Sequence, residues 1–339
     1  QETTIIRGTL GGLFEMRRET LDYTEGQLGR LALSVAAEVN ELHGSGFDLN
    51  AQAGRDIFLF DENQANNAAE TILDQNHLFS IADTYSNTAG RRVQASTQND
   101  GTAQIRYTIP VDPAAPLETR LNSVREITGD AYSILFRDDG NGTVGAEDFT
   151  VTSLSGSREV ALSAGDFVRT GDSAKLEFEG IRLLIDNVTR LQGGDSYEVR
   201  PTAGFAGLMK LGLTDPRDVA AAGSLEGGVI RPGDGRNAQA MANLQRAGLI
   251  GSSNPAEAST FIEAFSEIAG TVGVQAESAK LRGNAQTALV RQLTDQQQSI
   301  SGVNLDEEAA SLLRFQQAYQ ASAKLIAIAG SLLQSLLEI

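Results

Sequence analysis

Apolar residues recur every seven positions in the last stretch of the chain, over 303–339. We call this set the terminal row: Leu305, Leu312, Tyr319, Ile326 and Leu333. Seven-residue spacing is typical of a helix that packs along one narrow side, and the residues four positions further on are mostly small. Asn304 with Glu307 three residues later predicts a capped helix start. We therefore expect a helix over 302–339 that packs against other protein.

The terminal row has an alternative interpretation, a helix buried in the protein's own core. Its place at the end of the sequence and its small or polar companion positions favour contact with another helix instead. A membrane span is a weaker prediction, because the apolar run at 325–333 is far shorter than the ~20 residues that a span needs.

A second seven-residue row predicts a helix from about residue 12 to residue 42. Its members are Phe14, Leu21, Leu28, Val35 and Leu42. Gly26 and Gly29 each weaken such a helix by about 1 kcal/mol relative to alanine, so it must be held by packing. The glycines at 44 and 46 predict an end in a left-handed turn, where a charged His43 would suit the last carbonyl groups.

Short runs with strand character fill the section from 55 to 203. They are 57–60, 104–109, 133–136, 149–154, 176–178, 181–185 and 197–199. Alternation on both sides of Gly180 predicts a hairpin with one solvent-facing side. Two prolines in the segment 112–116 make it stiff, and this break could divide the section into two subdomains near 110–116.

Helical patterns return after residue 204. One helix is expected over 237–249, and a longer one begins at Thr260, where Glu263 completes a capping box. The longer helix has a row of its own: Phe265, Val272, Ala279, Gln286, Leu293 and Ile300. Helical sections that bracket a β section predict that the β part is inserted into a helical rod.

We therefore predict a multidomain α+β chain, a coiled-coil-like bundle of long helices with an inserted β-rich domain or domains. Residues 1–54 form the first part of the rod, and 55–203 form the β-rich outer section. Residues 204–301 form the second part of the rod, and 302–339 form the C-terminal assembly helix.

The charge of the chain limits the classes of molecule that it can bind. It has 44 acidic and 27 basic residues, a formal charge of −17, which argues against binding to nucleic acid or to an anionic membrane. Cysteine is absent, so disulfides and thiolate metal sites are excluded. The first ten residues lack the basic and apolar parts of a cleavable signal peptide, and we expect a fragment of a longer parent protein or a processed chain.

Motifs that could carry chemistry have simpler explanations. The Gly-Asp-Ser sequences at 171–173 and 194–196 stand where turns between strands are expected. The oxygen-rich segment 139–143 lacks the glycine and glutamate of a calcium loop, which favours a hairpin turn. His77 has no second ligand at metal-binding spacing. We expect no catalytic, cofactor or metal site.

The segments 302–310 (GVNLDEEAA) and 312–324 (LLRFQQAYQASAK) closely resemble the C-terminal signature of bacterial flagellar axial proteins. The resemblance is closest to the hook-associated FlgK family, the first hook–filament junction proteins. The segments 10–15 (LGGLFE) and 28–32 (LGRLA) resemble the helical part of that family. The segment 194–199 (GDSYEV) resembles its outer domain less specifically.

This resemblance implies an extracellular structural subunit, exported by the flagellar type III route without a cleaved signal. Its partners would be like subunits in a ring, the hook protein, the second junction protein and a dedicated export chaperone. Assembly and chaperone contacts would fall on the terminal row. Two alternatives remain open: another flagellar axial protein (the second junction protein or a divergent flagellin), and a secreted glycan-active enzyme with two carboxylates in a cleft of the β section.

Overall fold

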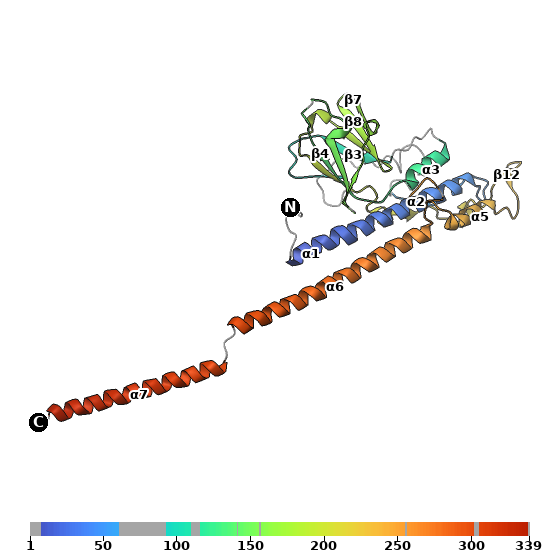
Figure 1. Ribbon diagram of the computed structural model, residues 1–339. Coiled ribbons are helices and arrows are strands. Elements are labelled where there is room, and N and C mark those ends of the chain that lie inside the picture. The colour runs from blue at the N-terminus through green and yellow to red at the C-terminus, as the bar shows by residue number, and fades with distance from the viewer. Residues whose placement is uncertain are drawn as a thin grey trace. The chain divides into compact units, whose positions relative to one another are not determined.

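The structure is a computed structural model that describes residues 8–60, 93–109, 116–140, 142–155, 157–254, 256–301 and 305–337. The chain divides into two compact units, Gln1–Val274 and Gln275–Ile339, and each is described by itself. Long helices at both ends of the sequence and an inserted β-rich region confirm the predicted fold class (Figure 1).

The first unit begins with a long helical segment. It consists of α1 (Gly8–Met16), a π-helical stretch (Arg17–Asp22) and α2 (Tyr23–Ser45). The helix predicted over 12–42 is thus present, but its buried side differs from the expectation. Leu21 is exposed, and Leu28, Val35 and Leu42 are only half-buried.

The buried side of α2, which includes Leu33, consists largely of small residues. They are Gly26, Gly29, Ala32, Ala36 and Ala37. A Cβ atom at Gly29 would overlap the carbonyl oxygen of Thr202, and one at Gly26 would overlap that of Gly129. The chain after the last sandwich strand therefore lies directly on the helix backbone. This is the packing that compensates for the two glycines.

The end of α2 corrects two predictions. Gly46 has φ −97° and is extended rather than left-handed; a side chain there would overlap Asn237, so close packing requires this glycine. His43 is fully buried, and its hydrogen bonds require a neutral ring rather than the predicted imidazolium. Its Nε2 accepts a hydrogen bond from the backbone N–H of Ala220 at 2.8 Å, and its Nδ1 donates to the carbonyl of Arg55 at 2.5 Å.

The buried state of His43 predicts a pH dependence of stability. Burial lowers the pKa of its imidazole below the ordinary value of 6.5. The unfolded chain therefore binds a proton more readily, so the contribution of His43 is complete above pH 6.5 and falls as the pH drops from 6.5 toward the lowered pKa. At pH 7.5 we expect His43→Gln to lower the free energy of unfolding by about 2 kcal/mol.

Urea unfolding of both chains between pH 7.5 and pH 5 checks this expectation. The advantage of the wild type over His43→Gln should shrink as the pH falls. His77 is present in both chains, so its titration cancels from the difference. An advantage that stays constant over this range would mean that His43 does not change its protonation on unfolding.

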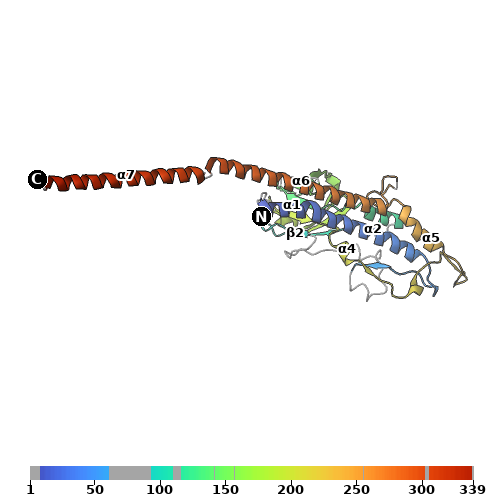
Figure 2. The ribbon, with the colours of Figure 1, turned by 90° about the horizontal axis from the view of Figure 1, so that it is seen from below.

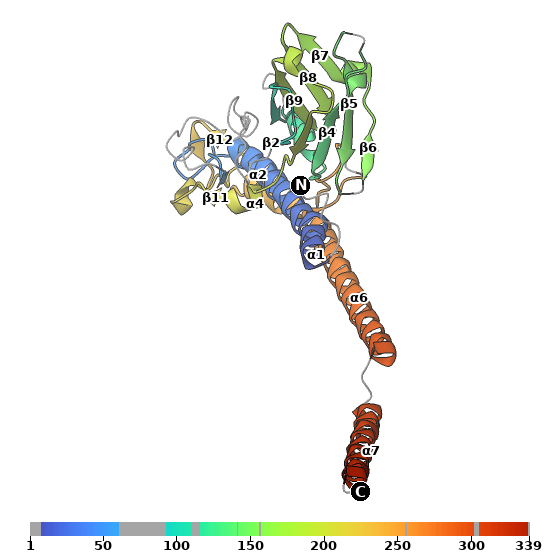
Figure 3. The same ribbon diagram turned by 90° about the vertical axis from the view of Figure 1, so that its left-hand side faces the viewer.

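Two antiparallel sheets make a β sandwich. The five-stranded sheet has the order β2-β10-β4-β5-β6 and the four-stranded sheet the order β3-β9-β8-β7. The strands are β2 (Val93–Ala95), β3 (Gln104–Thr108), β4 (Tyr132–Phe136), β5 (Phe149–Ser153), β6 (Arg158–Val160), β7 (Phe167–Thr170), β8 (Ser173–Phe178), β9 (Ile181–Asp186) and β10 (Ser196–Val199). Figures 1 and 3 show the sandwich as a lobe beside α2.

Both sheets contribute to one apolar core. Tyr107 and Leu183 come from the four-stranded sheet, and Ile134 and Val151 come from the five-stranded sheet. Each sheet takes strands from both sides of the segment 110–116, which itself lies largely outside the described residues. The strands of the sandwich therefore share one core, and residues 110–116 do not divide them into two sheets with separate cores.

The hairpin around Gly180 has the predicted form. Strands β8 and β9 pair with Phe178 opposite Ile181, and Leu176, Phe178, Ile181 and Leu183 all point into the core. Glu179 and Gly180 both have positive φ, 43° and 73°, as a tight type I′ turn requires.

Smaller elements complete the first unit. They are β1 (Phe58–Leu59), α3 (Leu117–Arg125), α4 (Phe205–Leu208), β11 (Lys210–Leu211), β12 (Leu225–Glu226), β13 (Val229–Ile230) and α5 (Arg236–Asn243). Arg125 at the end of α3 donates to Glu38 of α2 and to Glu118, each at 2.6 Å. The Arg125–Glu38 ion pair is buried, and it joins α3 to α2.

The long helix α6 (Phe261–Ser301) begins with the predicted capping box. The N–H of Thr260 donates to the Glu263 carboxylate at 2.9 Å, and the N–H of Glu263 donates to the Thr260 hydroxyl at 3.2 Å. The start of α6 lies beside α2 (Figure 2), where Ala264 and Ile268 are buried. Phe265, the first member of the predicted row, is exposed instead.

Candidate assembly surface

The terminal row lies on α7 (Leu305–Leu337), the last helix of the second unit. Leu312, Tyr319, Ile326 and Leu333 are 68%, 77%, 73% and 62% exposed. The side chain of Leu305 and the predicted cap residue Asn304 lie outside the described residues. Side chains of this size are normally buried. Several of them exposed on one helix therefore indicate a surface for another protein.

The apolar surface of α7 is wider than the sequence indicated. Phe315, three residues after Leu312, is 76% exposed. Further exposed apolar side chains gather at the C-terminal end of the helix: Leu325, Ile328, Leu332, Leu336 and Leu337. These positions surround much of the helix circumference. An apolar face this wide exceeds what a single narrow helix contact covers, which favours contact with more than one neighbour at the end of α7.

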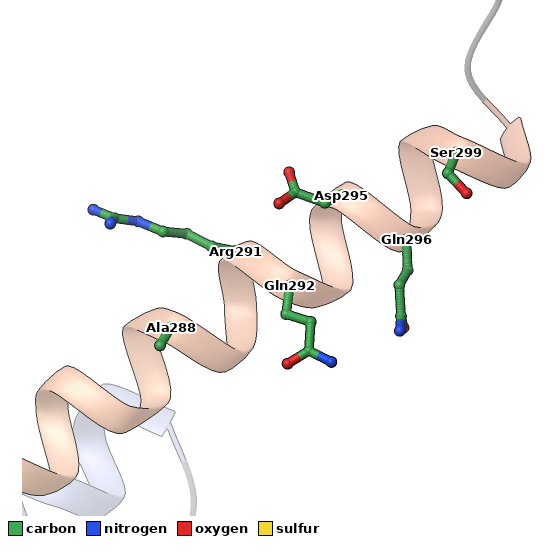
Figure 4. A pocket seen from close by; sticks show the side chains of 6 residues that line it. All are labelled: Ala288, Arg291, Gln292, Asp295, Gln296 and Ser299. Carbon is green, nitrogen blue, oxygen red and sulfur yellow. The ribbon is translucent and has the colours of Figure 1, made fainter.

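The part of α6 in the second unit is also amphipathic. Leu289, Val290 and Leu293 are exposed apolar residues on one side. The other side carries polar residues, Arg291, Gln292, Asp295, Gln296 and Ser299, together with Ala288 (Figure 4). These side chains come from successive turns of a single helix and point outward, so they enclose no binding site. The polar side is suited to water, and the apolar side to protein contact.

The Gly-Asp-Ser sequences are turn structures. Gly171 and Asp172 connect β7 to β8, and the Asp172 carboxylate accepts from the N–H and hydroxyl of Thr189 at 3.0 and 2.8 Å. Asp195 is buried and accepts from the backbone N–H groups of Asp100, Gly101 and Gln192 at 3.0–3.1 Å. Each aspartate thus holds a loop, the role that turn chemistry predicts.

The segment 139–143 lies between the paired strands β4 and β5, as the hairpin interpretation requires. The buried Asp148 carboxylate organises the loop by accepting from the N–H groups of Asp139 at 3.3 Å and Gly145 at 2.8 Å. Among the described residues, no group of three or more histidine or acidic side chains is placed to hold a metal ion. Nor does any described helix have the length and apolar character needed to cross a membrane.

Comparisons with known proteins cover both ends of the chain. A family model described as "Flagellar hook-associated protein FlgK helical domain" matches residues 1–58. Another, described as "Flagellar basal body rod FlgEFG protein C-terminal", matches residues 296–339, which contain the terminal row. Flagellar hook-associated protein 1 of Escherichia coli is 30% identical over 339 residues, covering 100% of the chain and 50% of that relative. The chain is similar over its full length to proteins of the FlgK family.

Other FlgK-family relatives agree. Flagellar hook-associated protein 1 of Salmonella typhimurium is 28% identical over 342 residues, covering 100% of the chain and 51% of that protein. The solved FlgK hook junction protein of Burkholderia pseudomallei has the same fold, with a TM-score of 0.61 over 89% of this chain and 64% of that one at 18% identity. The chain spans about half the length of the curated FlgK relatives it matches.

Proposed function

We propose that this chain is part of a structural subunit that joins the flagellar hook to the filament. The observation that carries the proposal is the exposed terminal row on α7, in a chain whose relatives over its full length are flagellar hook-associated proteins. The row would pack against helices of like subunits in a ring. The hook protein and the second junction protein would be its axial neighbours.

Export of this subunit would follow the flagellar type III route to an extracellular position. An α7 helix with this much exposed apolar surface would aggregate in the cell unless covered. A dedicated chaperone that binds the terminal row before export would solve this problem, and the subunit partners would replace it afterwards.

A non-enzymatic role fits the described β section better than glycan cleavage does. The groove beside the five-stranded sheet has two carboxylates in its lining, Asp22 and Glu198. Both bind the same guanidinium group, that of Arg200, at 2.9 and 2.5 Å. Two carboxylates bonded to the same arginine are not placed as the opposed pair, one on each side of a sugar, that glycan cleavage needs.

Localisation of the protein tests the proposal directly. Gold-labelled antibodies against the β sandwich should decorate intact flagella at one place, the boundary between hook and filament. Label along the whole filament would favour a flagellin-like subunit and contradict the junction role. A strain that lacks the gene provides the control, because it should show no label and should shed its filaments.

A further inference from the structure

A π-helical segment, Arg17–Asp22, interrupts the first helical part of the chain between α1 and α2 (Figure 2). In this form the backbone hydrogen bonds join residues five apart instead of four, so a π turn takes up one residue more than a regular turn. Such turns occur frequently at functional sites. Fewer than about 1% of residues in globular proteins are π-helical, which indicates that other contacts must hold this form in place.

The contacts of α2 fix its rotation about its own axis. A Cβ atom at Gly29 would overlap the carbonyl oxygen of Thr202, so this side of the helix must face the chain after β10. The Thr202 hydroxyl also donates to the carbonyl of Gly26 at 2.8 Å. Gly26 lies about one helical turn after Asp22. A change in the π-helical segment would therefore turn α1 rather than α2.

The contacts of α1 are weaker. Of its residues, only Gly11 is buried, and Phe14 is half-buried. Leu10, Leu13 and Met16 are each more than half exposed, and their spacing of three places them on one side of the helix. We call these three side chains the α1 apolar side. Because so little of α1 is buried, turning it about its axis would remove little packing.

One arginine holds the end of the π-helical segment. The Arg200 guanidinium, directly after β10, donates to the Asp22 carboxylate at 2.9 Å, and the two side chains are only 18% and 13% exposed. Glu198 accepts from the same guanidinium at 2.5 Å and so orients it. Within the helix, the Thr24 hydroxyl donates to the carbonyl of Thr20 at 2.5 Å, a side-chain bond that competes with the regular helix bond.

We propose that the π-helical segment is a conformational switch that sets the direction of the α1 apolar side, and that the Arg200–Asp22 ion pair holds it in the π form. Release of Asp22 returns the segment to the α form. The residue that the π turn took up then lengthens the α-helix, which turns α1 by about 100° relative to α2. A partner that fits the α1 apolar side in one direction is thus accepted in one state and refused in the other.

Distances between two spin labels test the switch in the single chain, independently of the proposed function. The chain has no cysteine, so labels can be attached at Leu13→Cys in α1 and Val168→Cys in β7, both exposed positions. Pulsed electron paramagnetic resonance should give one distance. With Arg200→Gln added, a second distance should appear that differs by up to about 8 Å, the movement of a helix surface turned by 100°. Its population should exceed the ~10% that bounds a typical minor state.

Deletion of Arg18 provides the decisive comparison. It removes the residue that the π turn takes up, so the segment becomes a regular α-helix with α1 in its present direction. The chain with this deletion and Arg200→Gln should therefore keep the single wild-type distance. The control Arg158→Gln removes another ion pair of the sandwich, to Glu179 at 2.6 Å, and should also leave the distance unchanged.

Three results would overturn the proposal. Arg200→Gln with only the wild-type distance would show that the ion pair does not hold the switch. A second distance that survives the deletion of Arg18 would show that α1 frays instead of turning. A changed distance on that deletion alone would show that the π turn does not take up the extra residue. If thermal unfolding shows that Arg200→Gln is not folded, Asp22→Ala breaks the same ion pair from the helix side and must give the second distance.

Discussion

A chain with both Leu312→Asp and Ile326→Asp is expected to lose its ability to join hook to filament. Each substitution puts a carboxylate in the middle of the terminal row, where partner helices would exclude water. An unpaired charge buried at such a contact costs on the order of 3 kcal/mol or more, and two in one helix would prevent stable packing. Swimming in soft agar should fall to the level of the deletion strain, with filaments released into the medium.

A matched control keeps the same charge on the same helix. Gln317→Asp with Gln320→Asp also adds two carboxylates to α7, but away from the terminal row and before the apolar C-terminal end of the helix. This variant should remain motile and should still bind the export chaperone. Equal loss of motility in both double variants would mean that added charge, rather than the terminal row, is responsible. The β sandwich should stay folded in both, since all its core residues lie in the first unit.

The terminal row could be predicted from the sequence because a seven-residue period requires no knowledge of the fold. Its width could not, since Phe315, Leu325 and Leu332 lie outside the period. All three are about as exposed as the row itself. A hydrophobic count around the whole helix, instead of along one period, would have found them.

The buried side of α2 was mispredicted for a related reason. Apolar periodicity predicted that Leu28 and Val35 are buried. The rest of the first unit instead packs against the glycines and alanines of the helix. Backbone that approaches a helix closely needs small residues, and these carry almost no hydrophobic signal. The spacing of Gly26 and Gly29 was the available clue.

Strand prediction succeeded where one side of a strand is buried. Strands β8 and β9 alternate cleanly and were found, but β2, β6 and β7 were missed. All three are edge strands of three or four residues, in which polar side chains replace the alternating pattern. The groove was also beyond prediction, because Arg17 and Arg200 are far apart in sequence and only the fold brings them to one Asp22 carboxylate.

The close approach of the chain to α2 leads to the last prediction, that Gly29→Ala lowers the free energy of unfolding by about 3 kcal/mol. The new methyl group would overlap the Thr202 carbonyl oxygen, which is backbone and cannot rotate away. The neighbouring bond from the Thr202 hydroxyl to the Gly26 carbonyl, 2.8 Å long, holds this segment in place. Urea unfolding followed by circular dichroism measures the change.

Gly273→Ala in α6 is the matched control, because a Cβ atom there meets nothing within 4 Å. Alanine is the better helix former, so this variant should be more stable by about 0.5–1 kcal/mol. Helix propensity alone predicts the same gain for Gly29→Ala. A Gly29→Ala chain that is more stable than the wild type would therefore show that Thr202 does not press against the helix. A loss of stability in Gly29→Ala together with a gain in Gly273→Ala would establish the contact between α2 and the chain that follows β10.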